Sequence, residues 1–127
     1  MVTENEYDAY FRQYIKLVNL EESIIKNLEN SQTYFYDLLN GLSEEKYNYR
    51  YSQGKWTIQE VVQHIIDTER IFAYRTLSFA RKDNTPLPGF DQDFFTKHSN
   101  ANSRNFKDLL EEMTLLRKGT ILLFKSL

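Results

Sequence analysis

The segment over residues 55–70 constrains the fold most, because it contains a helix start that can be identified from the sequence alone. Thr57 followed three residues later by Glu60 is a capping box, in which hydroxyl and carboxylate accept hydrogen bonds from backbone N–H groups at the helix end. Trp56 before the cap and Val61 beyond it can pack together as a hydrophobic staple. The sequence therefore predicts a helix that begins at Thr57.

We expect this helix to run to about residue 81 or 82 and to bury one broad face. Turning 100° per residue, that face carries mostly apolar residues. They are Ile58, Val61, Val62, Ile65, Phe72, Ala73, Thr76, Phe79 and Ala80. The opposite face carries Glu60, His64, Asp67, Ile71, Arg75 and Ser78. This arrangement predicts that His64 lies away from the main apolar stripe.

Two helices are predicted before this one. Thr3 and Glu6 form a second capping box, and apolar residues then recur at helical spacing over residues 7–18. The pattern restarts at Asn19 and continues as a longer amphipathic helix. We expect that helix to end at Gly41 in a left-handed cap.

The remaining segments alternate between connectors and helices. Residues 43–55 lose helical periodicity and are expected to form an extended connector against the bundle. Both prolines of the chain fall in a loop over residues 83–91, and residues 91–98 are expected to form one or two helical turns. A last helix is predicted to begin near Ser103, with Gly119 marking a kink or local end.

The composition favours a single all-α domain over residues 1–127, because the chain has only 4 glycines and 2 prolines. Its 16 basic and 18 acidic residues give a net charge of −2, which argues against nucleic acid as a partner. The chain has no cysteine, no basic and apolar leader, and no apolar run near the roughly 20 residues of a membrane span. We therefore expect a cytoplasmic protein without a membrane partner.

The motif in the central helix resembles that of a known family. It reads Trp56-Thr57-x-x-Glu60-Val61-x-x-His64-Ile65-x-Asp67-x-Glu69-Arg70. This is similar to the W-[ST]-x-x-E-x-x-x-H-[IL]-x-D-x-E pattern of the DinB/YfiT-like superfamily of bacterial proteins. Residues 49–51, 54–56, 72–75 and 85–91 resemble one subgroup of that family. The resemblance extends over essentially the whole chain.

The resemblance implies an up-down-down-up four-helix bundle and a divalent metal, commonly zinc or nickel, held by three histidines. It places the first of these histidines at His64. The other two are expected on a later helix, in a pattern like H-x-x-x-H, beyond residue 127. After residue 64 the chain contains only His98, which lies in a polar connector and matches no ligand position. We therefore expect a bundle that is incomplete at its C-terminus.

Four residues are candidates for the site, and each has a structural alternative. His64 is the candidate metal ligand, or else a histidine on a polar face bonded to Glu60 or Asp67 one turn away. Glu60 is either a capping residue or a base, and Asp67 either orients the His64 ring or is solvated. Arg75 either attracts an anionic substrate or is an exposed charge. The residues indicate no catalytic group beyond these.

Two functions of different classes follow. The resemblance implies a metal-dependent hydrolase or a transferase that uses low-molecular-weight thiols, in which a metal on His64 would activate water or a thiol. The alternative is a metal-free helical interaction module. In that case three long amphipathic helices leave an apolar groove, and a second copy would complete the bundle in a homodimer or larger oligomer.

Overall fold

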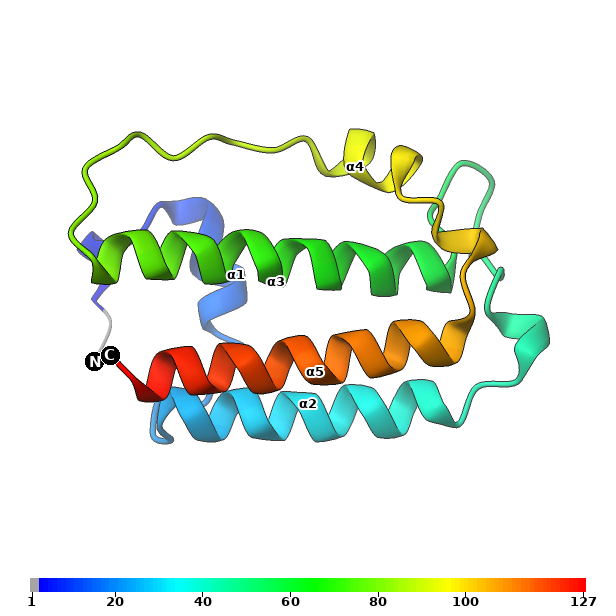
Figure 1. Ribbon diagram of the computed structural model, residues 1–127, viewed down its shortest axis with the longest axis horizontal. Helices are drawn as coiled ribbons and strands as arrows, with labels where there is room; N and C mark the ends of the chain where they lie inside the picture. Colours follow the sequence, from blue (N-terminus) through cyan, green and yellow to red (C-terminus); the bar gives the residue numbers. More distant parts are fainter. Residues whose placement is uncertain (1–2) are drawn as a thin grey trace.

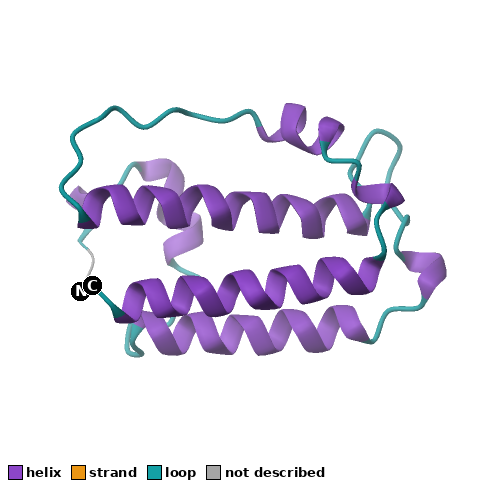
Figure 2. Cartoon of the chain, in the orientation of Figure 1, coloured by secondary structure: helices purple, strands orange, loops and turns teal. Residues whose placement is uncertain are grey.

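The computed structural model describes residues 3–127, and this part of the chain contains helices and no strand (Figure 2). The predicted all-α class is confirmed. Three long helices dominate: α2 (Ile24–Asn40), α3 (Ile58–Ala80) and α5 (Phe106–Lys125). The short elements are α1 (Arg12–Ile15), α4 (Gln92–His98) and 3₁₀ turns at Glu4–Glu6, Ala9–Phe11, Glu44–Lys46 and Ala101–Ser103.

Helix α5 holds the bundle together, because it packs against both α2 and α3 (Figure 1). The core lies along these two contacts and is built from large apolar side chains. Its buried members are Leu39, Val62, Ile66, Phe106, Leu109, Leu110 and Met113. Tyr47 from the connector stacks on Phe106, with ring centroids 3.9 Å apart. The connector is thereby fixed to the start of α5.

The predicted start of α3 is confirmed. The Thr57 hydroxyl accepts from the Glu60 N–H at 3.1 Å, and the Glu60 carboxylate accepts from the Thr57 N–H at 2.7 Å. The Thr57 hydroxyl also donates to the side-chain oxygen of Asn102 at 2.6 Å, and Asn102 donates to the second oxygen of Glu60 at 2.9 Å. The cap therefore fixes the beginning of α3 and also ties it to the segment that leads into α5.

The apolar face predicted for α3 coincides only in part with the face that the helix buries, so that prediction is wrong in part. The buried residues of the helix are Gln59, Val62, Gln63, Ile66 and Ser78. Within the predicted stripe Val62 is 1% exposed, whereas its neighbour Val61 is 41% exposed. Helix α3 thus has two apolar faces, one against α5 and one without a helix packed on it.

A nearly buried ion pair links all three long helices. The guanidinium of Arg117 in α5 forms a bidentate ion pair with the carboxylate of Glu69 in α3, with N···O distances of 2.8 to 3.0 Å. The same guanidinium donates to the Leu28 carbonyl and the Ser31 hydroxyl of α2. Both charged side chains are at most 14% exposed. Because the carboxylate and guanidinium satisfy one another, the burial of two charges is tolerated here.

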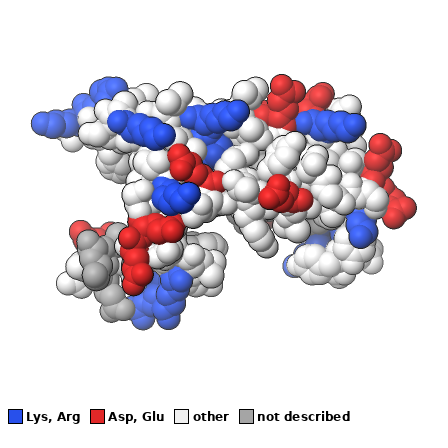
Figure 3. Space-filling view, turned by 90° about the horizontal axis from the view of Figure 1, so that it is seen from below, with Lys and Arg blue, Asp and Glu red and all other residues white. Residues whose placement is uncertain are grey.

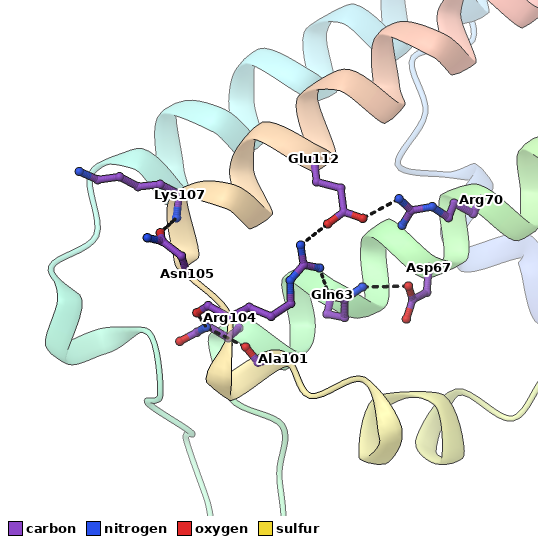
Figure 4. Close-up of polar contacts among 9 residues, drawn as sticks. Gln63, Asp67, Arg70, Ala101, Arg104, Asn105, Lys107 and Glu112 are labelled. Carbon is purple, nitrogen blue, oxygen red and sulfur yellow. Dashed lines mark hydrogen bonds and ion pairs between the residues drawn. The ribbon is translucent and has the colours of Figure 1, made fainter.

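A second polar network lies next to this ion pair, toward the beginnings of α3 and α5 (Figure 4). Glu112 accepts from both Arg104 and Arg70, and Arg104 also donates to the side-chain oxygen of Gln63. Burial raises the pKa of Glu112, but the hydrogen bonds and charges of the two arginines outweigh this and lower it overall. Gln63 in turn donates to Asp67 at 2.9 Å, which extends the network along α3.

The N-terminal segment does not form the single helix predicted over residues 7–18. The Thr3–Glu6 capping box is present, but the chain then breaks into 3₁₀ turns and the four-residue α1. Most of the apolar side chains at helical spacing are exposed, with Leu17 at 85%. Because a short helix is only marginally stable without a packing surface, the periodicity alone does not produce one here.

Three other boundaries differ from expectation. Helix α2 begins at Ile24, after a Ser23 cap, rather than at Asn19. Gly41 ends it with φ −84°, so the predicted left-handed cap is wrong. Helix α5 continues through Gly119 to Lys125, so the predicted kink or local end at Gly119 is wrong.

The segments between the long helices are more ordered than the sequence indicates. The expected extended connector contains a 3₁₀ turn at Glu44–Lys46 and is not extended throughout. The helical turns expected over residues 91–98 are confirmed as α4, capped by Asp91.

The surface is mixed in charge. On the face seen from below, basic and acidic side chains are interspersed (Figure 3). Among the described helices, none combines the length and apolar character that crossing a membrane requires.

Candidate functional site

The main concave surface is a groove between α2 and α3, which we call the α2–α3 groove. It has a volume of about 620 Å³, within the range of ligand pockets in proteins. Its walls are mostly apolar and aromatic. They comprise Phe35, Leu38 and Leu39 of α2, Ile58, Val61, Val62 and Ile65 of α3, Leu42, Tyr49, Tyr51, Gly54, Lys55 and Trp56 of the chain between these helices, and Asp93 of α4.

His64 lies at the edge of this groove. Its ring is 4.9 Å from that of Trp56, which lines the groove, with the planes inclined by 50°. Its Nδ1 is 3.5 Å from the hydroxyl of Thr68. His64 is half-buried, although the helical wheel places it away from the main apolar stripe.

The environment of His64 favours its neutral form. Burial lowers the pKa of the imidazole below its usual 6.5, while the negative charges of Asp67 and Asp93 act in the opposite direction and only partly offset the burial. The ring is therefore neutral at pH 7, with a lone pair available on one nitrogen.

The two carboxylates one turn from His64 have other hydrogen-bond partners. Glu60 accepts from the Thr57 backbone and from Asn102, and so acts as a cap. Asp67 accepts from Gln63 and reaches His64 through its charge. The expected alternative in which Glu60 or Asp67 bonds the ring is replaced by the contact with Thr68.

Arg75 lies in a different part of the molecule. Its guanidinium donates to the Pro88 carbonyl at 2.8 Å and lies 5.4 Å from the centre of the Phe72 ring. It lines a smaller pocket of about 320 Å³ under the proline-containing loop. The structure thus groups His64 and Asp67 near the groove and separates Arg75 from them.

The described residues do not fit a complete catalytic metal site. Such a zinc site usually has three side-chain ligands and a water. Within residues 3–127, no group of three or more His, Cys, Asp or Glu side chains is arranged to hold a metal ion. His98 is exposed on α4, where its Nδ1 lies 2.7 Å from the Phe94 carbonyl. His64 therefore offers a single ligand.

Two neighbours of His64, Asp93 and Thr68, were not predicted from the sequence. Asp93 comes from α4, nearly 30 residues later in the chain, and no periodicity links it to α3. Thr68 is one turn from His64 on the same helix, so its spacing of four residues was an available signal. The helical wheel indicated the charged residues Glu60 and Asp67 as partners of His64 instead.

Comparison with known proteins gives one family and one curated relative. Residues 27–127 match the sequence profile of the DinB superfamily. A protein of Oceanobacillus iheyensis, named "Putative metal-dependent hydrolase", is 31% identical over 70 residues. The aligned part covers 54% of this chain and 40% of that relative. No solved structure matches the chain.

Proposed function

The chain belongs to the DinB superfamily, and from this premise we propose that it is the groove-forming part of a metal-dependent hydrolase or a low-molecular-weight-thiol transferase. In this proposal His64 is one ligand of a zinc or nickel ion. The other ligands come from groups seated on the α2–α3 groove in addition to the described residues.

The observation that carries the proposal is the placement of His64. The neutral imidazole is the form that binds a metal, and burial favours that form here. The ring packs beside Trp56, a wall of the apolar groove, where a metal would activate a bound water or thiol. The name of the Oceanobacillus relative supports the same reaction class.

The chain's other residues contribute position rather than chemistry. The capping box and its bond to Asn102 fix the start of α3, and so fix the height of His64 along the groove. Trp56 packs beside the ring, and the charge of Asp93 faces it from α4. These contacts would hold the imidazole in place before any ligand arrives.

Nuclear magnetic resonance with added Ni²⁺ tests this proposal. The paramagnetic ion broadens signals near its binding site, so we expect selective loss of the His64 ring signals at low Ni²⁺ concentration. The Trp56 ring, 4.9 Å from that of His64, should broaden as well, and this broadening should disappear in His64→Ala and persist in His98→Ala, the matched control. Equal broadening of the His64 and His98 rings, or none at His64, would contradict the proposal.

A second function is favoured by two observations. The α2–α3 groove is open, and His64 is a single candidate metal ligand among the described residues. We propose as the alternative a metal-free helical module that buries the α2–α3 groove against a second copy of the chain. Light scattering across the micromolar concentration range tests this alternative. The expected result is a mass that rises toward twice that of the chain, and a constant monomer mass would exclude it.

A further inference from the structure

Two of the apolar surfaces exposed within residues 3–127 are complementary to one another. One is the α2–α3 groove. The other is the N-terminal aromatic segment, residues 7–20. Its exposed apolar residues are Tyr10, Phe11, Tyr14, Leu17, Val18 and Leu20, each between 45% and 85% exposed. Exposed apolar area of this extent indicates a surface that binds a partner.

The segment carries the sequence pattern of an amphipathic helix but does not form one. The spacing of three and four residues from Tyr7 to Val18 would place the apolar side chains on one face of a helix. In the monomer the segment is instead divided among a 3₁₀ turn, the four-residue α1 and irregular chain. Binding in an apolar groove would supply the packing surface that such a helix needs.

The groove offers a matching surface. On α3 the side chain of Val61, 41% exposed, lines the groove beside the half-buried Ile58 and Ile65. Leu38 of α2, 52% exposed, lines the groove from the other side. A helix laid between α2 and α3 would contact both walls at once, as in a four-helix bundle.

We propose that the N-terminal aromatic segment of one copy forms a helix in the α2–α3 groove of a second copy, and that the exchange is reciprocal. The inference rests on the interaction-module alternative and names the part of the second copy that fills the groove. Aromatic side chains bury about 150–250 Å² each when enclosed, so the three half-exposed aromatic residues of the segment alone bring on the order of 300 Å². Two exchanged segments with matching groove walls give roughly 1,200 Å² from these residues, the lower end of specific interfaces.

The anchoring of the segment favours a second copy over the same chain. Asn19 and Asn27 exchange two hydrogen bonds, at 3.2 and 2.8 Å, which fix the linker to the first turn of α2. The groove lies at the other end of α2, on residues 35–42 and on residues 58–65 of α3. Figure 1 shows α1 toward the left of the molecule, whereas the cyan end of α2 and the start of α3 lie to the right.

Light scattering of charge-insertion variants tests the exchange. Wild-type chain should be a dimer, and both Leu17→Glu on the segment and Val61→Glu on the groove should give monomers. Leu122→Glu, on the exposed side of α5 at a position 67% exposed, is the matched control and should remain dimeric. All three changes are at exposed sites, and circular dichroism with thermal melting verifies that each variant is folded.

Mixing the two monomeric variants makes the test specific. A Leu17→Glu chain keeps its groove and a Val61→Glu chain keeps its segment, so a mixed dimer has one of its two exchanged contacts intact. The mixture should therefore regain dimers that neither variant forms alone, at higher concentration than the wild type needs. A mixture that stays monomeric would overturn the exchange. If Val61→Glu is a monomer and Leu17→Glu a dimer, the exchange is overturned while the groove remains an association surface. A monomeric wild type would overturn both ideas.

Discussion

The two apolar faces of α3 differ in what surrounds them. The face toward α5 is closed by Val62 and Ile66 in the core and by the adjacent ion pairs of Glu69 and Arg70. The face toward the α2–α3 groove has apolar side chains of similar size, such as Val61 and Ile65, with no helix covering them. The same kind of residue thus stabilises the fold on one face and is available for binding on the other.

The largest effect should come from breaking the closed face at Arg117. Arg117→Met leaves the Glu69 carboxylate, 10% exposed, without its charge partner. We expect the free energy of unfolding to fall by about 3–5 kcal/mol, measured by urea denaturation. Lys125→Met removes an exposed pair with Glu29 at 3.6 Å and should cost less than about 1 kcal/mol. Equal effects of the two changes would contradict this view of the closed face.

The helix cap at the start of the groove should matter less. Thr57→Ala removes the oxygen that accepts from the Glu60 N–H and the hydroxyl that donates to Asn102. The expected loss is about 1–2 kcal/mol in the free energy of unfolding. Thr57→Ser keeps the oxygen and should recover most of it. A serine variant as unstable as the alanine variant would show that the methyl group, and not the cap, is responsible.

Acid should weaken the closed face through Glu112. Arg104 and Arg70 overcome the effect of burial and lower the pKa of Glu112 below its ordinary 4.5. Its ionised form is therefore favoured in the folded state. The resulting stability is present above pH 4.5 and is lost as pH falls through the lower folded-state pKa. We expect Glu112→Gln to flatten the acid limb of a plot of unfolding free energy against pH. An unchanged limb would contradict this role.

The smallest expected effect is on the groove face, in the titration of His64. Burial lowers its pKa, and the charges of Asp67 and Asp93 oppose that change. Removing either charge, in Asp67→Asn or Asp93→Asn, should lower the pKa further. Because the folded-state pKa lies below 6.5, the stability linked to His64 is present above that pH and declines as pH falls through it. Ring signals followed by nuclear magnetic resonance measure the shift, and a rise in either variant would contradict it.

The sequence was sufficient for local features of α3 and insufficient for its orientation. Thr57 and Glu60 form the predicted cap because a capping box depends only on residues three apart. The buried face was misassigned because Gln59 and Gln63 count as polar. Gln59 is buried by donating to the Ala101 and Arg104 carbonyls, and Gln63 accepts from the Arg104 side chain. Such partners lie over 40 residues away and leave no periodic signal.

The sequence was enough to predict the family to which the candidate site belongs, but not which residues surround His64. The motif with His64 and Asp67 identifies the superfamily that residues 27–127 match. The position of His64 beside Trp56 and facing Asp93 depends on how α4 and the connector fold back on α3. The N-terminal helix was wrongly predicted for a related reason, because periodicity indicates a helix only where a surface exists to bury it.

The central claim is that α3 folds on one face and binds on the other, and Val61 and Val62 test it most directly. They are adjacent valines, 41% and 1% exposed. Each is changed to alanine in the Leu17→Glu background, which should be monomeric, and unfolding is followed in urea. We predict a loss of about 1.5–3 kcal/mol for Val62→Ala and less than about 0.5 kcal/mol for Val61→Ala. Equal losses at the two positions would contradict the account.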